Sequence, residues 1–263
     1  VAKGQIVREI DALGGQMGVI TDKATIQFRM LNLSKGAAMW SPRAQCDKAQ
    51  FSALWRQTLE NTRNLYLWQD SVVELLFDES DNERIAGVRT AFGVEFKASA
   101  VILTNGTFLG GLMHVGRSSA EGGRAGDAAS HGVTESLRQR GFEVGRMKTG
   151  TPVRIDARTV NFEALEAQYG DERPAKFSFL PTTSPVEKQL PCFLVYTSKE
   201  VHDTLRTGFD ESPLFNGTIK GFLFLVTFTY TTLLSKSRSL ILIFIRLRCL
   251  TPVEKRKFVI TQL

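Results

Sequence analysis

The segment between Val101 and Arg158 holds most of the residue types that can bind a nucleotide or another phosphate. It contains Thr104-Asn105-Gly106-Thr107 after a short apolar run, then Gly122-Gly123-Arg124-Ala125-Gly126-Asp127, and then Lys148-Thr149-Gly150-Thr151-Pro152. Glycines allow a backbone to approach an anion closely, and hydroxyl, lysine and arginine side chains donate hydrogen bonds to phosphate oxygens. One short glycine motif alone is more often an ordinary turn. The three together predict a cofactor-holding α/β domain with an anion-binding surface.

The surrounding pattern predicts the elements that position these residues. Val101, Ile102 and Leu103 suit a strand buried on both faces of a parallel sheet, where ligands bind at the strand ends. A helix over residues 125–140 would follow the glycine cluster, so that its free amides could face a phosphate. Upstream, an amphipathic helix is expected over residues 43–62, followed by a meander of short strands at 65–68, 72–77, 85–90 and 94–96.

Composition excludes several classes of protein. The chain has 263 residues and a formal net charge of +6, but residues 221–263 carry seven Lys or Arg and one Glu, which accounts for the whole excess. The three cysteines and three histidines have neither disulfide-framework nor metal-ligand spacing, so no metal site and a reducing compartment are expected.

The two ends of the chain differ from its middle. Residues 222–234 and 240–250 are apolar, but neither reaches the ~18 residues needed to span a bilayer as a helix, so a membrane anchor is not expected. Residues 1–20 lack the pattern of a secretory signal, and the chain starts at Val1. These features predict a fragment whose last part is a divergent tail.

Five motifs in one order carry a resemblance. They are Arg29-Met30-Leu31-Asn32-Leu33-Ser34-Lys35-Gly36, Pro42-Arg43-Ala44-Gln45, Leu103-Thr104-Asn105-Gly106-Thr107-Phe108-Leu109, Gly122-Gly123-Arg124-Ala125-Gly126 and Lys148-Thr149-Gly150-Thr151-Pro152-Val153-Arg154-Ile155-Asp156-Ala157-Arg158. Residues 1 to about 220 resemble the MnmG family, also called GidA, which are flavoproteins that modify the wobble uridine of certain tRNAs.

This resemblance implies an α/β fold: an incomplete FAD/NAD(P)-binding domain of the Rossmann type, similar to glutathione reductase, with an inserted α+β domain. Residues 1–142 would be the partial FAD-binding domain with its β-meander. Residues 143–220 would begin the inserted nicotinamide or substrate domain, and residues 221–263 would be a divergent tail outside the family fold.

The implied chemistry is modification of U34 of tRNA at C5, forming a carboxymethylaminomethyl or aminomethyl group. The resemblance implies FAD as cofactor, NADH as the nicotinamide and methylenetetrahydrofolate as co-substrate. The implied partners are tRNA, an MnmE-type GTPase and a second copy in a homodimer. The expected compartment is the cytoplasm, with the mitochondrion as the alternative.

The resemblance also implies site residues. Lys3 and Gly4 match the end of the glycine-rich segment beside the flavin, Val72 matches a strand residue at the adenosine part, and Ser130 matches a second FAD contact. The full set of expected cofactor contacts is Lys3, Gly4, Val72, Thr104, Gly106, Thr107 and Ser130. The basic residues expected to contact tRNA are Arg43, Arg124, Lys148 and Arg154.

Two departures leave alternatives open. The chain has no G-x-G-x-x-G motif, and neither of the family's two redox cysteine motifs occurs in it, so no catalytic residue is assigned. The fragment alone is therefore expected to be inactive. The alternatives are a non-catalytic module that binds RNA or a partner, a flavoprotein like the folate-dependent tRNA uracil methyltransferases, and a small membrane-associated protein.

Overall fold

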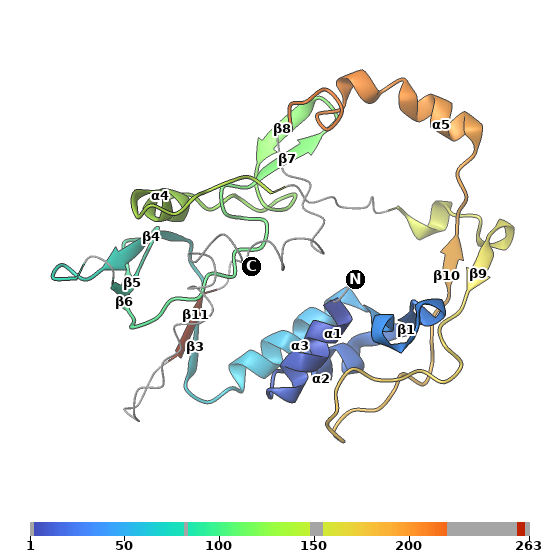
Figure 1. Cartoon of the computed structure of the whole chain (residues 1–263), viewed down its shortest axis with the longest axis horizontal. Coiled ribbons are helices and arrows are strands. Elements are labelled where there is room, and N and C mark those ends of the chain that lie inside the picture. Colours follow the sequence, from blue (N-terminus) through green and yellow to red (C-terminus); the bar gives the residue numbers. More distant parts are fainter. Residues whose placement is uncertain (1–2, 82–83, 148–154, 220–256, 261–263) are drawn as a thin grey trace. The chain divides into compact units, whose positions relative to one another are not determined.

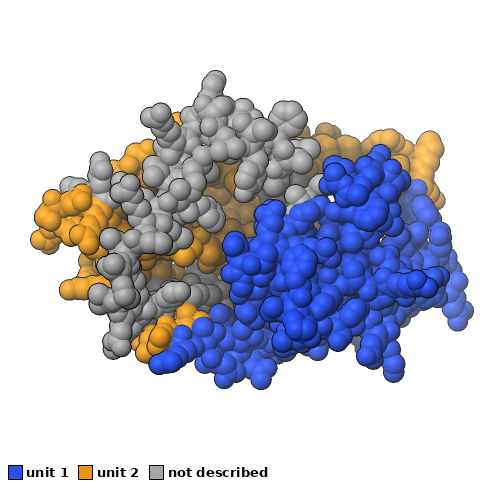
Figure 2. Space-filling model, turned by 60° about the horizontal axis from the view of Figure 1, so that its bottom comes forward, with its two compact units in different colours: residues 1–63, 153–197 blue, residues 64–152, 198–263 orange. Residues whose placement is uncertain are grey.

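The computed structural model describes residues 3–81, 84–147, 155–219 and 257–260. The chain forms two compact units, one of residues 1–63 with 153–197 and one of residues 64–152 with 198–263 (Figure 2). Each unit thus joins residues from both sides of the expected boundary at residue 142. The assignment of residues 1–142 and 143–220 to cofactor and substrate domains stays a prediction.

The first unit combines three helices with short antiparallel ribbons (Figure 1). In it α1 packs on α2, α2 packs on α3, and β1 pairs antiparallel with β2. Its buried apolar side chains are Val19, Ile20, Ala24, Phe28 and Phe177. Its elements are α1 Lys3–Ala12, α2 Met17–Ala24, β1 Thr25–Leu31, η1 Leu33–Lys35, η2 Ala37–Met39, β2 Ser41–Cys46, α3 Lys48–Glu60, η3 Ala157–Thr159, η4 Phe162–Ala164, β9 Glu166–Gln168 and β10 Cys192–Leu194.

The second unit is centred on an antiparallel sheet of three strands, β4, β5 and β6. Leu75, Val88 and Val133 form its buried cluster, so that α4 packs on β4. Its elements are β3 Leu65–Trp68, β4 Val72–Phe77, β5 Ile85–Thr90, β6 Glu95–Lys97, β7 Leu112–Val115, β8 Ser118–Glu121, α4 Val133–Gln139, α5 Lys199–Arg206, η5 Phe209–Glu211 and β11 Lys257–Ile260, which pairs parallel with β3.

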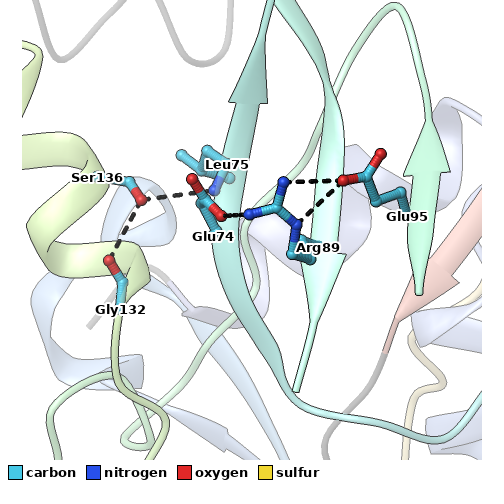
Figure 3. Close-up of polar contacts among 6 residues, drawn as sticks. All are labelled: Glu74, Leu75, Arg89, Glu95, Gly132 and Ser136. Carbon is cyan, nitrogen blue, oxygen red and sulfur yellow. Dashed lines mark hydrogen bonds and ion pairs between the residues drawn. The ribbon is translucent and has the colours of Figure 1, made fainter. Parts of the chain in front are cut away.

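The predicted meander is confirmed for β4, β5 and β6, whereas β3, its expected first strand, pairs with β11 instead. Figure 3 shows how side chains connect the three strands of the meander. Arg89 of β5 forms ion pairs with Glu74 of β4 and with Glu95 of β6, the latter at 2.8 Å. On the other side of β4, the Ser136 hydroxyl accepts the Leu75 N–H at 3.5 Å and donates to the Gly132 carbonyl at 3.3 Å. Cross-strand pairs of this kind hold the register that the alternating sequence predicts.

The prediction of a strand at residues 101–103 is wrong, because these residues form no ladder in the structure. Val101 and Leu103 pack against the buried cluster, whereas Ile102 is 80% exposed. The segment is therefore extended and covered on one face rather than two. The parallel layer expected around it is not formed by the residues that the structure describes.

Two predicted helices begin later than expected. The helix expected over residues 125–140 begins at Val133, where Glu135 accepts the Gly132 N–H at 3.2 Å. The helix expected over residues 43–62 begins at Lys48, after the Asp47 carboxylate has accepted the Gln50 N–H at 2.8 Å. Both starts are set by N-terminal capping, which satisfies otherwise free amides.

In the described part of the chain, no helix has the length and apolar character needed to cross a membrane. Nor do the described residues contain a group of three His, Cys, Asp or Glu side chains that could hold a metal ion. The apolar stretches 222–234 and 240–250 lie outside the described residues.

Candidate nucleotide-binding site

Ser130 joins two of the segments that the sequence predicts to contact a cofactor. Its side chain is buried, and its hydroxyl donates to the Val72 carbonyl oxygen at 3.1 Å. Its backbone N–H donates to the Phe108 carbonyl at 2.9 Å, and its carbonyl accepts the Gly110 N–H at 2.8 Å. The start of β4 and the loop after residue 104 are thereby fixed on either side of one serine, and we call this arrangement the Ser130 junction.

The loop of residues 104–111 turns back sharply at two glycines. Gly106 and Gly110 have φ values of 58° and 55°, a left-handed conformation that glycine adopts without steric cost. Phe108 donates its N–H to the Asn105 carbonyl at 3.1 Å, which closes the turn. Thr104, Gly106 and Thr107 are exposed at this turn, so an approaching ligand could reach their backbone.

The sequence predicted the glycine cluster at the start of a helix, but α4 begins only at Val133, and the cluster packs beside this loop instead. Gly122 donates its N–H to the Gly111 carbonyl at 3.0 Å, and the Thr107 hydroxyl donates to the Gly123 carbonyl at 2.7 Å. A Cβ on Gly123 would lie 2.4 Å from the Phe108 ring, so the position requires glycine. The cluster thus supports the loop through contacts at Thr107, Phe108 and Gly111.

Asp70 is a polar residue of this region that the sequence prediction missed. Its Oδ1 accepts the Ser71 N–H at 2.7 Å, and hydrogen bonding, first of all from the Thr90 side chain, holds the pKa of the Asp70 carboxyl below its ordinary value. A carboxylate oxygen two residues before Val72 is chemically suited to accept a ribose hydroxyl. The pattern of an acidic residue just before a strand is common, so spacing alone did not single it out.

Of the other predicted site residues, Lys3, Gly4 and Arg124 take no part in the hydrogen bonds described for the Ser130 junction. Lys3 and Gly4 belong to the first unit at the start of α1, and Gly4 is buried where a Cβ would meet the Pro42 carbonyl oxygen at 2.3 Å. Arg124 forms an ion pair with Asp127 at 2.6 Å. The predicted tRNA contacts Lys148 and Arg154 lie outside the described residues.

Arg43 lies in β2 and is held by a neutral partner. Its Nη2 donates to Gln27 Oε1 at 3.1 Å, and its Nε is buried without a partner among the described residues. A guanidinium has five N–H donors, so most of its capacity is still open to an anion. Its role as a tRNA contact stays a prediction.

Burial raises the pKa of the Cys46 thiol above its ordinary value, and the nearby Asp22 carboxylate acts in the same direction. We therefore expect folded Cys46 to react with iodoacetamide only at a pH above the ~8.5 midpoint of an ordinary cysteine, because the thiolate is the reactive form. Mass spectrometry of the Cys46 peptide across a pH series measures this midpoint. The same peptide in urea is the control, and a folded midpoint at or below the urea value would contradict the burial argument.

The small sheets, the helices beside them and the glycine loops at the Ser130 junction are consistent with an α/β chain that forms part of a dinucleotide-binding fold. The model of the family described as glucose inhibited division protein A matches residues 1–224, and the chain belongs to this family. Among curated relatives, the tRNA uridine 5-carboxymethylaminomethyl modification enzyme MnmG of Bacteroides thetaiotaomicron is 57% identical over 220 residues, and that of Flavobacterium johnsoniae is 53% identical over 220 residues.

A crystal structure of Aquifex aeolicus GidA gives the same result in three dimensions. It superposes with a TM-score of 0.76 at 42% identity, covering 84% of this chain and 37% of that one. The matches to the two MnmG proteins cover 84% of this chain and 35% of each relative. The chain therefore spans about a third of the length of the relatives it matches.

Proposed function

We propose that this chain is part of an FAD-dependent enzyme that modifies U34 of tRNA at C5, forming a carboxymethylaminomethyl or aminomethyl group. The names of the relatives support this reaction, since they are called tRNA uridine 5-carboxymethylaminomethyl modification enzymes. The structural observation that carries the proposal is the Ser130 junction, where the hydroxyl of Ser130 meets the Val72 carbonyl at 3.1 Å.

The residues of the second unit fit a dinucleotide. The exposed backbone at Thr104, Gly106 and Thr107 can approach a pyrophosphate or ribose, and Val72 offers a strand edge to an adenine. Bound FAD would supply the electron transfer, and the chain's own residues would position it. Lys3 and Gly4 complete the proposed set of cofactor contacts, with NADH as the nicotinamide and methylenetetrahydrofolate as the one-carbon co-substrate.

The proposed tRNA contacts are Arg43, Arg124, Lys148 and Arg154. Guanidinium and ammonium groups bind phosphate through charge-assisted hydrogen bonds, and such contacts position a nucleic acid without reading its sequence. The proposed protein partners are an MnmE-type GTPase and a second copy of the chain in a homodimer. The proposed compartment is the cytoplasm, with the mitochondrion as the alternative.

A chimera tests this function directly. Residues 1–220 of this chain would replace the matching segment of the Bacteroides thetaiotaomicron relative, in a host that lacks its own copy of that enzyme. We expect C5-modified U34 to reappear in digested tRNA measured by mass spectrometry, and the same chimera with Ser130→Ala to retain less flavin. A folded, flavin-bound chimera that leaves U34 unmodified would contradict the proposal, and 5-methyluridine in its place would favour the methyltransferase alternative.

The 263-residue chain by itself is expected to bind FAD weakly. It has no G-x-G-x-x-G motif, and the helix-terminal amides of such a motif supply charge-assisted hydrogen bonds worth roughly 1.5–3 kcal/mol each. Flavin absorbance after desalting and a fluorescence titration with FAD measure this affinity. Micromolar or tighter binding would contradict the expectation, whereas colourless protein that binds tRNA in a salt-dependent way would favour the RNA-binding module.

A further inference from the structure

The β1–β2 ribbon places two arginines directly opposite each other. Arg29 of β1 is the register partner of Arg43 of β2. Directly opposed residues of an antiparallel pair point to the same face, with Cβ atoms about 5 Å apart. Like charges at such a position destabilise the pair. The arrangement therefore calls for a negative group between or beside the two guanidiniums.

The Asp171 carboxylate lies beside the ribbon, where it accepts the Met30 N–H at 2.7 Å, but no described carboxylate forms an ion pair with Arg29 or Arg43. Neither arginine takes part in any ion pair described for this chain, and Arg29 makes no described hydrogen bond. Arg43 has the neutral Gln27 as its hydrogen-bond partner at 3.1 Å, and its Nε is buried and unpaired within the described part of the chain. A buried charged donor without a partner carries a desolvation cost that a bound anion would remove.

The partner of Arg43 is itself held firmly. Gln27 is 1% exposed, and its Nε2 donates to the carbonyls of Gln168 and Leu190 at 3.0 and 3.1 Å. The Cys192 thiol also donates to Gln27 Oε1 at 3.3 Å. This network fixes the amide oxygen that orients the Arg43 guanidinium. An anion would therefore meet at least one donor group that is already in place, which lowers the entropic cost of binding.

We propose that Arg29 and Arg43 form an oxyanion clamp that binds a phosphate group on the polar face of the β1–β2 ribbon. Two planar guanidinium forks match the several oxygens and the charge of a phosphate better than the two oxygens of one carboxylate. The phosphate can belong to the backbone of an RNA or to the pyrophosphate of a dinucleotide cofactor. The RNA source rests on the proposed tRNA activity, whereas the clamp itself does not.

Inorganic phosphate tests the clamp without any activity assay. We expect sodium phosphate to raise the thermal midpoint of the chain relative to sodium chloride at equal ionic strength, because a ligand that binds the folded state stabilises it. Arg29→Gln should lose this gain, and in chloride it should unfold at the same or a higher temperature because the repulsion is gone. Arg29→Lys keeps the charge without the fork and should retain part of the gain.

Arg56→Gln is the matched control, because Arg56 lies in the same unit with a side chain that is 75% exposed and paired with Glu60. It removes one positive charge but should keep the full response to phosphate. The clamp would be overturned if phosphate raised the thermal midpoint of Arg29→Gln as much as that of the native chain. It would also be overturned if phosphate did not raise the thermal midpoint of the native chain.

Two titrations distinguish the sources of the phosphate. Labelled tRNA and FAD are each titrated against the native chain, Arg29→Gln and Arg56→Gln over a salt series. The RNA source is supported if Arg29→Gln binds tRNA about tenfold more weakly than the native chain. The slope of log affinity against log salt concentration should then also be smaller by about one. A loss confined to FAD supports the cofactor source. Equal affinities of Arg29→Gln and Arg56→Gln for both ligands would contradict binding of either phosphate at the clamp.

Discussion

Replacing Gly132 by alanine is expected to destabilise the second unit by about 3 kcal/mol or more. Gly132 has a φ of 98°, which side-chain-bearing residues rarely adopt. A Cβ there would also lie 2.0 Å from the Val73 carbonyl oxygen, a distance that forces the backbone of β4 and the start of α4 apart. Because Val73 is a strand residue held by its neighbours, the strain cannot be relieved by one side-chain rotation.

Gly126→Ala is the matched control for this substitution. Gly126 has a similar φ of 86°, but nothing lies within 4 Å of the position that its Cβ would occupy. It should therefore cost only the conformational strain of a left-handed residue, about 1 kcal/mol. Urea unfolding followed by circular dichroism measures both variants, and equal midpoints for Gly132→Ala and Gly126→Ala would refute the clash.

The Gly132 substitution should also affect the Ser130 junction. Ser130 is two residues away and donates to the Val72 carbonyl at 3.1 Å, next to the Val73 carbonyl that the new Cβ would displace. We expect faster hydrogen exchange at the Ser130 and Gly110 amides in Gly132→Ala than in Gly126→Ala, since both amides depend on that geometry. Unchanged exchange at both amides would show that the junction is independent of the α4 start.

Replacing Asp22 by alanine is expected to destabilise the first unit by about 3–5 kcal/mol. The Asp22 carboxylate is 9% exposed and accepts the N–H groups of Phe177 and Ser178 at 2.6 and 3.0 Å. It also accepts the Thr183 hydroxyl at 2.8 Å. Alanine would leave three buried donors without a partner, and it would release residues 177–183 from α2.

Asp47→Ala is the control for Asp22→Ala, because Asp47 also accepts a backbone N–H, that of Gln50 at 2.8 Å, but does so at an exposed helix cap. Loss of such a cap costs about 1 kcal/mol. Limited proteolysis should cut Asp22→Ala between residues 176 and 183 while Asp47→Ala stays resistant there. A smaller loss of unfolding free energy in Asp22→Ala than in Asp47→Ala would show that the three hydrogen bonds do not hold this segment.

Patterns of neighbouring residues were sufficient to predict several elements of the fold. β3 and β4 were predicted with the observed bounds, Leu65–Trp68 and Val72–Phe77, and β5 with Ile85–Thr90. Their β-branched, aromatic and alternating residues are a signal within each strand, and polar turns separate them. A local signal also sets the start of α5, because the Ser198 hydroxyl accepts the Val201 N–H at 3.3 Å as a helix cap.

Elements that depend on distant partners were not predictable in the same way. Residues 43–46 were predicted to begin a helix, but they belong to β2 and pair with β1 in an antiparallel ladder. Residues 101–103 have the composition of a buried strand, yet the structure gives them a covering layer on one face only. Strand propensity reports suitability for a half-buried surface and not the presence of the partner strand.

For the candidate site too, the sequence indicated some of the residues, and only the folded structure showed which of them meet. The sequence by itself determined the family, through ordered motifs, and pointed to Val72, Gly106 and Ser130 as residues of interest. Only the tertiary structure decided that Ser130 meets Val72 across 58 residues and that Asp22 meets Thr183 across 161. It also decided that Arg29 and Arg43 face each other. The physical reason is that propensity and periodicity act between near neighbours, whereas hydrogen bonds and charge contacts between distant segments exist only once the chain has folded.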